Sequence, residues 1–135
     1  MKRLKIADFG FAHLIGQKTL LHSVVGTPAY YAPEVCNRRR DGYSKPADMW
    51  SIGVILFACL CGFFPFDEER DVEEQIREGN FKFEDQYWGH ISEDAVDLVA
   101  NLLVVEPKQR FTVDQMLQHD WFRTSRQLNI TPEAV

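Results

Sequence analysis

The stretch 44–60 constrains the fold more than any other part of the chain. Pro46 lies where the first turn of a helix tolerates proline, and from Ile52 onward apolar residues occupy every side of the helix. A helix that is apolar all round has to be covered all round. The sequence therefore predicts a buried central helix on which other helices pack, and Gly53 permits one of them to approach closely.

The same region is the one candidate for a membrane span. The apolar run from Met49 to Phe64 contains Ser51, is shorter than the roughly 20 residues that a bilayer crossing requires, and is followed by Pro65. We therefore expect no transmembrane segment, and interpret the run as the core helix of a globular domain.

Length and charge limit the class of protein further. The 135 residues suit one domain, and 45% hydrophobic with 26% charged residues is an ordinary globular balance. The formal charge of -5 argues against a broad nucleic-acid or anionic-membrane surface, because both need clustered positive charge. We expect no nucleic-acid partner.

The three cysteines, Cys36, Cys59 and Cys61, are odd in number and have no redox-motif or metal-site spacing, which is typical of a reducing compartment. Cys59 and Cys61 would point to nearly opposite sides of a helix, which makes them poor candidates for a mutual bridge or a shared metal. We therefore expect the cysteines to be small buried residues. No amino-terminal signal sequence is visible. The expected location is cytoplasmic, with the nucleus, or membrane recruitment through further domains, as alternatives.

The remaining elements predict a mainly α chain. Ser92 is the expected N-cap of a helix that reaches Leu103, with Ile91 and Val96 as a hydrophobic staple. The Thr112–Gln115 spacing predicts a capping box for the last helix. Before these helices, Leu4–Ala7 and Phe11–Leu14 are expected to form a short pair of strands, and the polar tail is 124–135.

Two tripeptides near the amino terminus carry the chemistry. They are Asp8-Phe9-Gly10 and Ala32-Pro33-Glu34. Magnesium takes oxygen ligands and is usually bound through one or two carboxylates and the substrate phosphates, so Asp8 is a candidate metal ligand. Taken by itself, Asp8 would rather be interpreted as an ordinary carboxylate of a surface turn.

The order of these motifs, with Gly26-Thr27-Pro28 leading into the second, resembles the protein kinases, whose activation loop lies between Asp-Phe-Gly and Ala-Pro-Glu. The run 23–30 is similar to the protein kinase D subfamily of the calcium/calmodulin-dependent group. The resemblance implies a kinase large lobe over residues 1–123. It implies ATP and Mg²⁺ as cofactors of the complete enzyme, with Asp8 as metal and nucleotide ligand and with Phe9 and Gly10 in structural roles.

The resemblance also implies regulatory sites in the loop. Ser23 and Thr19 match positions that an upstream kinase phosphorylates, and a phosphate there orders the loop by pairing with basic side chains. Kinases of this group usually have Lys or Arg where His13 stands. Because histidine is only partly charged near neutral pH, loop ordering in this chain is expected to be weaker or pH-dependent.

Gly26, Thr27 and Pro28 match the floor that supports the acceptor peptide in the family, and Thr27 is the residue type of kinases that modify Ser or Thr. Protein Ser/Thr substrates are therefore the implied partners. Glu34 matches a carboxylate that family members pair with an arginine, here Arg110, and Asp48 matches the aspartate that holds the backbone of the catalytic loop. By its position alone, Asp48 also suits the first turn of a helix.

The acidic run 67–74 has two interpretations. It forms either a solvated face or a rim that attracts basic substrate peptides. Some kinases that prefer basic substrates read arginine with a glutamate in the core helix, but here Ala58 stands at that position.

The residues before Asp8 contain no Gly-rich loop, no strand lysine and no catalytic loop with its aspartate, all of which precede Asp-Phe-Gly in kinases. The first hypothesis is thus the carboxyl-terminal part of a Ser/Thr kinase, with little or no activity by itself and with the preceding kinase half as its partner. The alternative is a non-catalytic, kinase-like binding module. The first hypothesis predicts exposed apolar surface where the preceding half docks.

Overall fold

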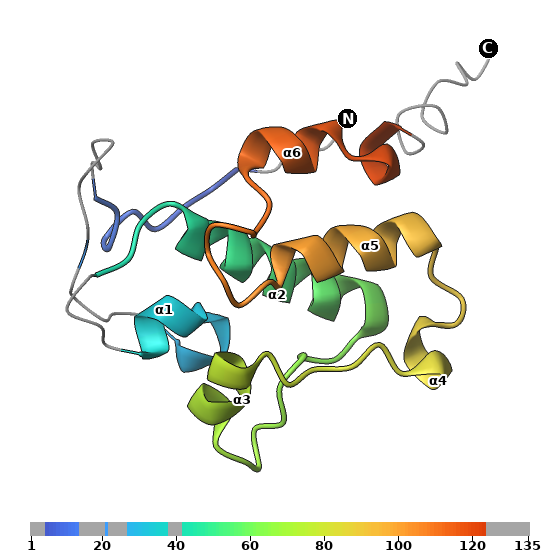
Figure 1. The fold of residues 1–135 in the computed structure, drawn as a ribbon, viewed down its shortest axis with the longest axis horizontal. Helices are drawn as coiled ribbons and strands as arrows, with labels where there is room; N and C mark the ends of the chain where they lie inside the picture. The colour runs from blue at the N-terminus through green and yellow to red at the C-terminus, as the bar shows by residue number, and fades with distance from the viewer. Residues whose placement is uncertain (1–4, 14–20, 22–26, 38–41, 124–135) are drawn as a thin grey trace.

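The computed structural model describes residues 5–13, 21, 27–37 and 42–123. Within them the helices follow in the order η1 (Pro28–Tyr30), α1 (Pro33–Cys36), α2 (Pro46–Cys61), α3 (Val72–Glu78), α4 (Asp85–Trp88), α5 (Glu93–Leu102) and α6 (Val113–Gln118). Helix α2 crosses the centre, α5 runs beside it, and α1 and α3 lie on the opposite side from α6 (Figure 1). No helix in this part of the chain combines the length and apolarity needed to cross a bilayer.

Helix α2 begins and ends close to the limits predicted from the sequence. Pro46 occupies the first turn, where a missing N–H costs nothing, and Gly62 closes the helix in the left-handed conformation at φ +87°. The Gly62 N–H donates to the carbonyl of Ala58 at 2.9 Å. A residue with a side chain is strained at this φ, so glycine sets the end of the helix.

The two predicted helix starts are confirmed. The Ser92 hydroxyl accepts a hydrogen bond from the Ala95 N–H at 3.3 Å at the start of α5. Thr112 and Gln115 form both halves of the capping box of α6, at 3.3 and 2.9 Å. Ile91 and Val96, the expected staple, are partly buried and both pack against the main hydrophobic core.

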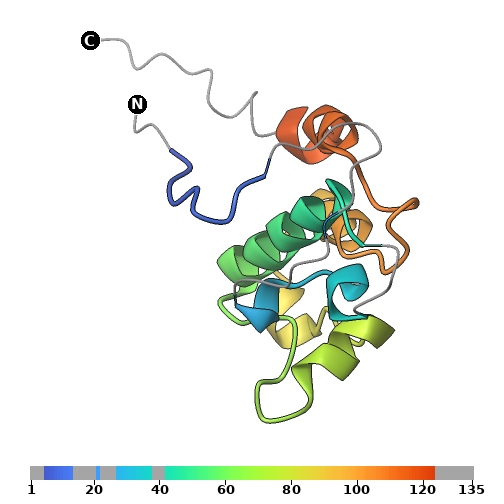
Figure 2. The ribbon, with the colours of Figure 1, turned by 90° about the vertical axis from the view of Figure 1, so that its left-hand side faces the viewer.

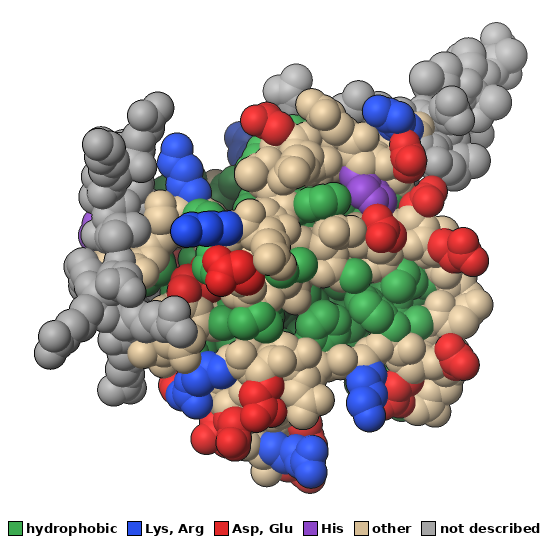
Figure 3. Space-filling model, viewed as in Figure 1, with side chains coloured by type: hydrophobic (Ala, Val, Ile, Leu, Met, Phe, Trp, Pro, Cys, Tyr) green, Lys and Arg blue, Asp and Glu red, His purple; other side chains and the backbone are tan. Residues whose placement is uncertain are grey.

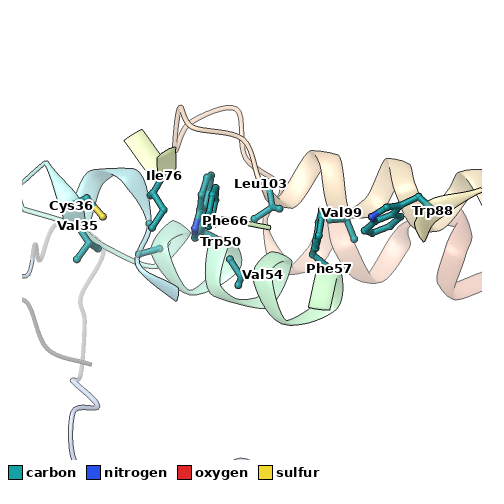
Figure 4. Close-up of a cluster of buried hydrophobic side chains, with 12 residues drawn as sticks. Val35, Cys36, Trp50, Val54, Phe57, Phe66, Ile76, Trp88, Val99 and Leu103 are labelled. Carbon is teal, nitrogen blue, oxygen red and sulfur yellow. The ribbon is translucent and has the colours of Figure 1, made fainter. Parts of the chain in front are cut away.

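The main core lies between α2 and the elements on either side of it. Trp50, Val54 and Phe57 extend from α2 toward Val99 of α5 and Leu103 just beyond it, while Ile76 enters from α3 (Figure 4). The other members labelled in the close-up are Val35, Cys36, Phe66 and Trp88. Burial of such side chains contributes about 1.5 to 3 kcal/mol each, so this cluster supplies most of the driving force for folding.

The predicted strand pair is wrong for the described residues 5–13, where we find one turn and no strand; Leu4 and Leu14 lie outside them. The turn is closed by the Ala12 N–H, which donates to the Phe9 carbonyl at 3.0 Å. Residues 5–13 are all exposed, and most of this segment stands away from the helices (Figure 2). An isolated pair of short strands is marginal in water, and here no apolar face supports it. β structure in the described residues is limited to a bridge between Leu21 and Tyr43.

The prediction that α2 is covered on every side is also wrong. Asp48, Ile55 and Cys59 are exposed and Ile52 is half-buried, and they follow one another along one face of the helix. Ile55 is 49% exposed. The cysteine prediction holds for Cys36, which is buried, and fails for Cys59, because Cys59 lies on this uncovered α2 stripe.

We predict that Gly53→Ala destabilises the protein. A Cβ at Gly53 would lie 2.9 Å from Leu102 Cβ and from Leu103 Cδ2, closer than real side chains pack. Overpacking of this kind costs about 1 to 3 kcal/mol, and the better helix propensity of alanine returns only about 1 kcal/mol. Urea unfolding followed by tryptophan fluorescence measures the net loss of stability. Cys59→Ala, on the exposed side of the same helix, is the control, and a Gly53→Ala protein as stable as its parent would contradict the close packing.

Candidate functional site

The two kinase-like segments meet around one pocket of about 360 Å³. Residues 11–13, which follow Asp-Phe-Gly, form one wall, and residues 30–32, which lead into Ala-Pro-Glu, form another. Asp48 and Ser51 of α2 complete the lining on their side. The structure thus brings together segments that are about 20 residues apart in the sequence. The pocket is bounded by α2, so the position of the site depends on the core helix.

The segment 28–31 is tied to α2 by a residue that sequence analysis missed. The Ser51 hydroxyl donates to the Tyr30 carbonyl at 2.9 Å. The Ala47 carbonyl, one turn earlier in α2, lies 3.3 Å from the Ser51 Oγ. In the sequence, Ser51 stands out only as an interruption of an apolar run. A lone hydroxyl in such a run was the available signal, because a half-buried hydroxyl needs a partner.

Glu34 and Arg110 form the predicted carboxylate–guanidinium fork. Arg110 Nη1 lies 2.7 Å from Glu34 Oε1 and Nη2 lies 2.9 Å from Oε2. The side chain of Arg110 is 0% exposed and that of Glu34 is 12% exposed. Two parallel bonds in this geometry fix orientation as well as distance, so Glu34 and the segment that carries it have one defined position.

Arg110 joins more elements than the fork alone. Its Nη1 also donates to the Pro46 carbonyl at 2.7 Å and its Nε donates to the Val104 carbonyl at 2.9 Å. The guanidinium lies 5.2 Å from the ring centroid of Trp50, a favourable cation–π arrangement. One buried side chain therefore connects α1, the start of α2 and the turn that follows α5.

The residues of the predicted peptide floor are only partly described. Thr27 and Pro28 are exposed at the start of η1, and the Thr27 side chain does not cap that helix. Gly26 and the predicted phosphorylation sites Ser23 and Thr19 lie outside the described residues. Thr27 and Pro28 therefore face solvent from a segment that Ser51 and Glu34 hold in place.

Asp8 lies on the exposed amino-terminal segment in the left-handed conformation, at φ +62°. Such a conformation is uncommon outside glycine, although aspartate tolerates it better than most residues. The Asp8 carboxylate is not among the lining residues of the pocket, and the described residues contain no group of three or more side chains suited to a metal ion. Asp8 therefore fits Mg²⁺ as one ligand, and the phosphates, water or another segment have to supply the rest.

Asp48 lies at the junction of two hollows. It lines the pocket described above and also a larger groove of about 1120 Å³, which we call the α2–α6 groove; residues 107–115, Met49 and Ile52 line that groove as well. Although Asp48 keeps contact with solvent, desolvation raises the pKa of its carboxyl above the ordinary value. A carboxylate in the first turn of a helix is normally stabilised, so desolvation outweighs the helix end here.

Cys36 is not a nucleophile at neutral pH. Burial, followed by the nearby Glu73 carboxylate, raises the pKa of its thiol to about 11. The thiolate is the reactive form of cysteine, and the buried thiol stays protonated. Cys36 therefore acts as a packing residue between α1 and α3.

Comparison with known proteins decides the family. Residues 1–122 match the family model described as the protein kinase domain. This chain belongs to the protein kinase domain family. The mostly helical structure and the Glu34–Arg110 fork agree with the large lobe of such a domain.

Several similar curated proteins are named as serine/threonine-protein kinases. The chain is 47% identical over 121 residues to serine/threonine-protein kinase D2 of Rattus norvegicus, an alignment of 90% of this chain and 14% of that protein. It is equally identical to serine/threonine-protein kinase D3 of Mus musculus, and 45% identical to myosin light chain kinase A of Dictyostelium discoideum, where it covers 42% of the relative. The chain spans about one seventh of the length of the kinase D relatives.

We predict that Glu34→Gln strongly destabilises the chain. The substitution leaves the Arg110 charge buried without its carboxylate, and breaking such a pair costs about 3 to 5 kcal/mol. The measurement is the free energy of unfolding in urea. The matched control is Glu73→Gln, which breaks the exposed 2.7 Å pair between Glu73 and Arg77 and should cost less than about 1 kcal/mol. Equal losses for the two substitutions would refute the architectural role of the fork.

We also predict that Asp48 makes stability depend on pH. The pKa of Asp48 is higher in the folded state than in the unfolded state, so the native state holds the proton more tightly. The free energy of unfolding therefore falls as pH rises from the unfolded pKa through the folded pKa. Asp48→Asn should remove that slope and be at least as stable as the parent at neutral pH. Asp114→Asn, in the exposed first turn of α6, is the control and should be slightly destabilising. A steeper slope in Asp48→Asn would contradict the sign.

Proposed function

We propose that this chain is the large-lobe part of a protein serine/threonine kinase that, when complete, transfers the γ-phosphate of ATP to Ser or Thr of protein substrates. The observation that carries this proposal is the pocket in which residues 11–13 and 30–32 meet beside Asp48. Residues 11–13 follow the implied metal ligand Asp8, and residues 30–32 follow the implied peptide floor, so the pocket lies between the two motifs that the resemblance assigns to metal and acceptor. Membership of the protein kinase family and similarity to kinase D relatives support it.

By itself the chain is expected to have little or no activity. Phosphoryl transfer depends on positioning and charge stabilisation, and the described residues offer one exposed carboxylate, Asp8, toward a magnesium ion. Bound Mg²⁺ would neutralise charge on the phosphates of ATP. The remaining residues that bind ATP, and the group that orients the acceptor hydroxyl, have to come from the preceding half.

The contribution of this chain is to support the acceptor. Thr27 and Pro28 are exposed, while the backbone beyond them is held by Ser51 at Tyr30 and by Arg110 at Glu34. This arrangement suits the family role of Gly26, Thr27 and Pro28 beneath the acceptor residue. Asp48, whose carboxylate is partly desolvated, is suited to accept hydrogen bonds from the backbone of an incoming catalytic loop.

The preceding half has a fitting place to dock. The uncovered α2 stripe is apolar over Ile52, Ile55 and Cys59, and the α2–α6 groove adjoins it with Phe111 and Val113 in its lining. Exposed apolar surface of this kind marks an interaction site and is a liability for a self-contained module. It favours an incomplete kinase over the alternative of a stand-alone binding module.

Regulation is proposed to act on the loop that precedes Thr27. Phosphorylation of Ser23, and of Thr19 as a second site, by an upstream kinase would order the loop. His13, which lines the pocket, stands where kinases of this group usually have a basic partner for the loop phosphate. The three free cysteines suit a reducing compartment, so we expect the complete kinase in the cytoplasm or nucleus.

The test is reconstitution. The chain is co-expressed with the preceding part of the catalytic domain of kinase D2, and transfer of ³²P from ATP-Mg²⁺ to matched serine and tyrosine peptides is measured. We predict no transfer by the chain alone, transfer by the pair, and preference for serine. Ile55→Lys should prevent the two parts from co-purifying, because it places a charge on the docking stripe.

The matched control is Val105→Lys, at an exposed apolar position away from the α2 stripe. It should assemble like the parent. Transfer by the 135 residues alone, or assembly that tolerates Ile55→Lys, would refute the division of the active site between the two parts.

A further inference from the structure

Ser51 is connected to Pro28 through one rigid peptide unit. The Ser51 hydroxyl donates to the Tyr30 carbonyl at 2.9 Å. The Tyr30 carbonyl and the Tyr31 N–H belong to the same planar peptide bond, and this N–H donates to the Pro28 carbonyl at 2.9 Å. Loss of the Ser51 hydroxyl therefore frees the plane, and with it the position of the Pro28 carbonyl.

A second hydrogen bond extends this connection to Thr27. The Tyr30 N–H donates to the Thr27 carbonyl at 3.1 Å, so two backbone bonds close η1 into a single turn. Thr27 adds no support of its own, because its side chain does not cap η1. The exposed residues Thr27 and Pro28 thus lie on a short turn whose far end is bonded to α2.

Two contacts hold Tyr30 from different sides. Its ring meets Phe64 edge-on at 5.6 Å, and its carbonyl accepts from Ser51. Aromatic pairs are stable over centroid distances of about 4.5 to 7 Å, so the ring contact allows η1 to shift. A hydrogen bond is directional and tolerates a much smaller change in length. The Ser51 bond is therefore the contact that sets the distance between η1 and α2.

The Ser51 hydroxyl is not required by α2 itself. The Ala47 carbonyl lies 3.3 Å from the Ser51 Oγ, so the hydroxyl has an acceptor within its own helix even without η1. Alanine at this position would be a better helix former than serine. The role of the hydroxyl is thus found in the shorter bond, which leaves the helix and reaches Tyr30.

We propose that Ser51 is a positioning residue for the acceptor. Through the Tyr30 carbonyl it sets the height of Thr27 and Pro28 above α2, and this height determines how well the residue directly after the modified Ser or Thr is accommodated. The inference rests on the proposed function, under which the acceptor lies on these residues. Ser51 does not touch the acceptor, so its loss affects KM and selectivity between acceptors more than kcat.

The structural step is tested on the full chain by hydrogen–deuterium exchange followed by NMR. The rate at the Tyr31 amide is divided by the rate at the Val99 amide, which lies in the core of α5 and reports global stability. We expect Ser51→Ala to raise this ratio about fivefold, the factor that one hydrogen bond of this kind contributes.

Ser92→Ala is the matched control. It also removes a helix hydroxyl, one that accepts from the Ala95 N–H at 3.3 Å, and it weakens α5 without a contact to η1. It should not raise the ratio of the Tyr31 rate to the Val99 rate. An unchanged ratio in Ser51→Ala, or an equal rise in Ser92→Ala, would overturn the proposal, because the contact of Tyr30 with Phe64 would then suffice to hold η1.

The functional step uses the reconstituted pair and two acceptor peptides that differ only in having Val or Gly directly after the serine. Acidic side chains lie along the lower edge of the face drawn in Figure 3, over α3, with basic ones among them. Both peptides therefore carry the same Lys and Arg residues, so that charge attraction cancels in their ratio.

We expect the parent to favour the Val peptide, because Pro28 and the half-buried ring of Tyr30 offer apolar surface. Ser51→Ala should lower the ratio of kcat/KM for the Val peptide to that for the Gly peptide by about fivefold, through KM, while the KM for ATP is unchanged. This ratio does not depend on the amount of folded enzyme. Ser92→Ala should therefore leave it unchanged.

The outcomes separate this inference from the proposed function. If transfer occurs and the parent has no preference, or Ser51→Ala lowers kcat equally for both peptides, the positioning role is refuted and the kinase proposal stands. If no pair transfers phosphate, the kinase proposal falls, and fluorescence anisotropy of the two labelled peptides on the pair decides the positioning role. A ratio of Kd values that Ser51→Ala brings toward one supports it, and an unchanged ratio refutes it.

Discussion

The arrangement of the candidate site depends on the buried guanidinium of Arg110. Its donors reach the Glu34 carboxylate, the Pro46 carbonyl and the Val104 carbonyl, and its flat face lies over Trp50. A charge removed from water is costly unless every donor finds an acceptor, and here a carboxylate and backbone carbonyls satisfy it. The hydrogen bonds that Arg110 has to make therefore fix the relative positions of three segments that are far apart in the sequence.

Helix α2 connects the Arg110 site with the segment 28–31 and with α5. One side of it carries Ser51, which holds the Tyr30 carbonyl, and another carries Gly53, which lets α5 approach. The side with Ile55 is uncovered. The same helix thus supports the segment 28–31, anchors the core and presents an unfilled apolar face. These properties are consistent with a chain that contributes part of an active site.

Much negative charge and the exposed rings of Phe63, Phe64 and Tyr87 lie beyond the end of α2. Gln75 fixes the turn at Asp67, and the ring cluster around Trp88 fixes the facing segment. Rigid support leaves Phe63 and Tyr87 exposed at an opening instead of letting them collapse inward. Phe64, beside this opening, meets Tyr30 of η1 edge-on at 5.6 Å, so the two parts of the surface are in contact.

Local features follow from residue types that lie close together in the chain. The sequence predicted the limits of α2 within two residues, the N-cap at Ser92 and the capping box at Thr112, because helix ends depend on residue types at fixed spacing. The pairing of Glu34 with Arg110 was implied by the resemblance to the protein kinases, and the fold brings the two residues together. The sequence did not predict the exposed α2 stripe, the absence of strands in residues 5–13, the Ser51 bond to Tyr30 or the hollow of about 280 Å³ beyond the end of α2. The sequence identifies Ile55 as apolar but does not say which segment, if any, packs over it. These features depend on the three-dimensional fold, because packing, hydrogen bonding and enclosure of a pocket involve residues that are distant along the chain.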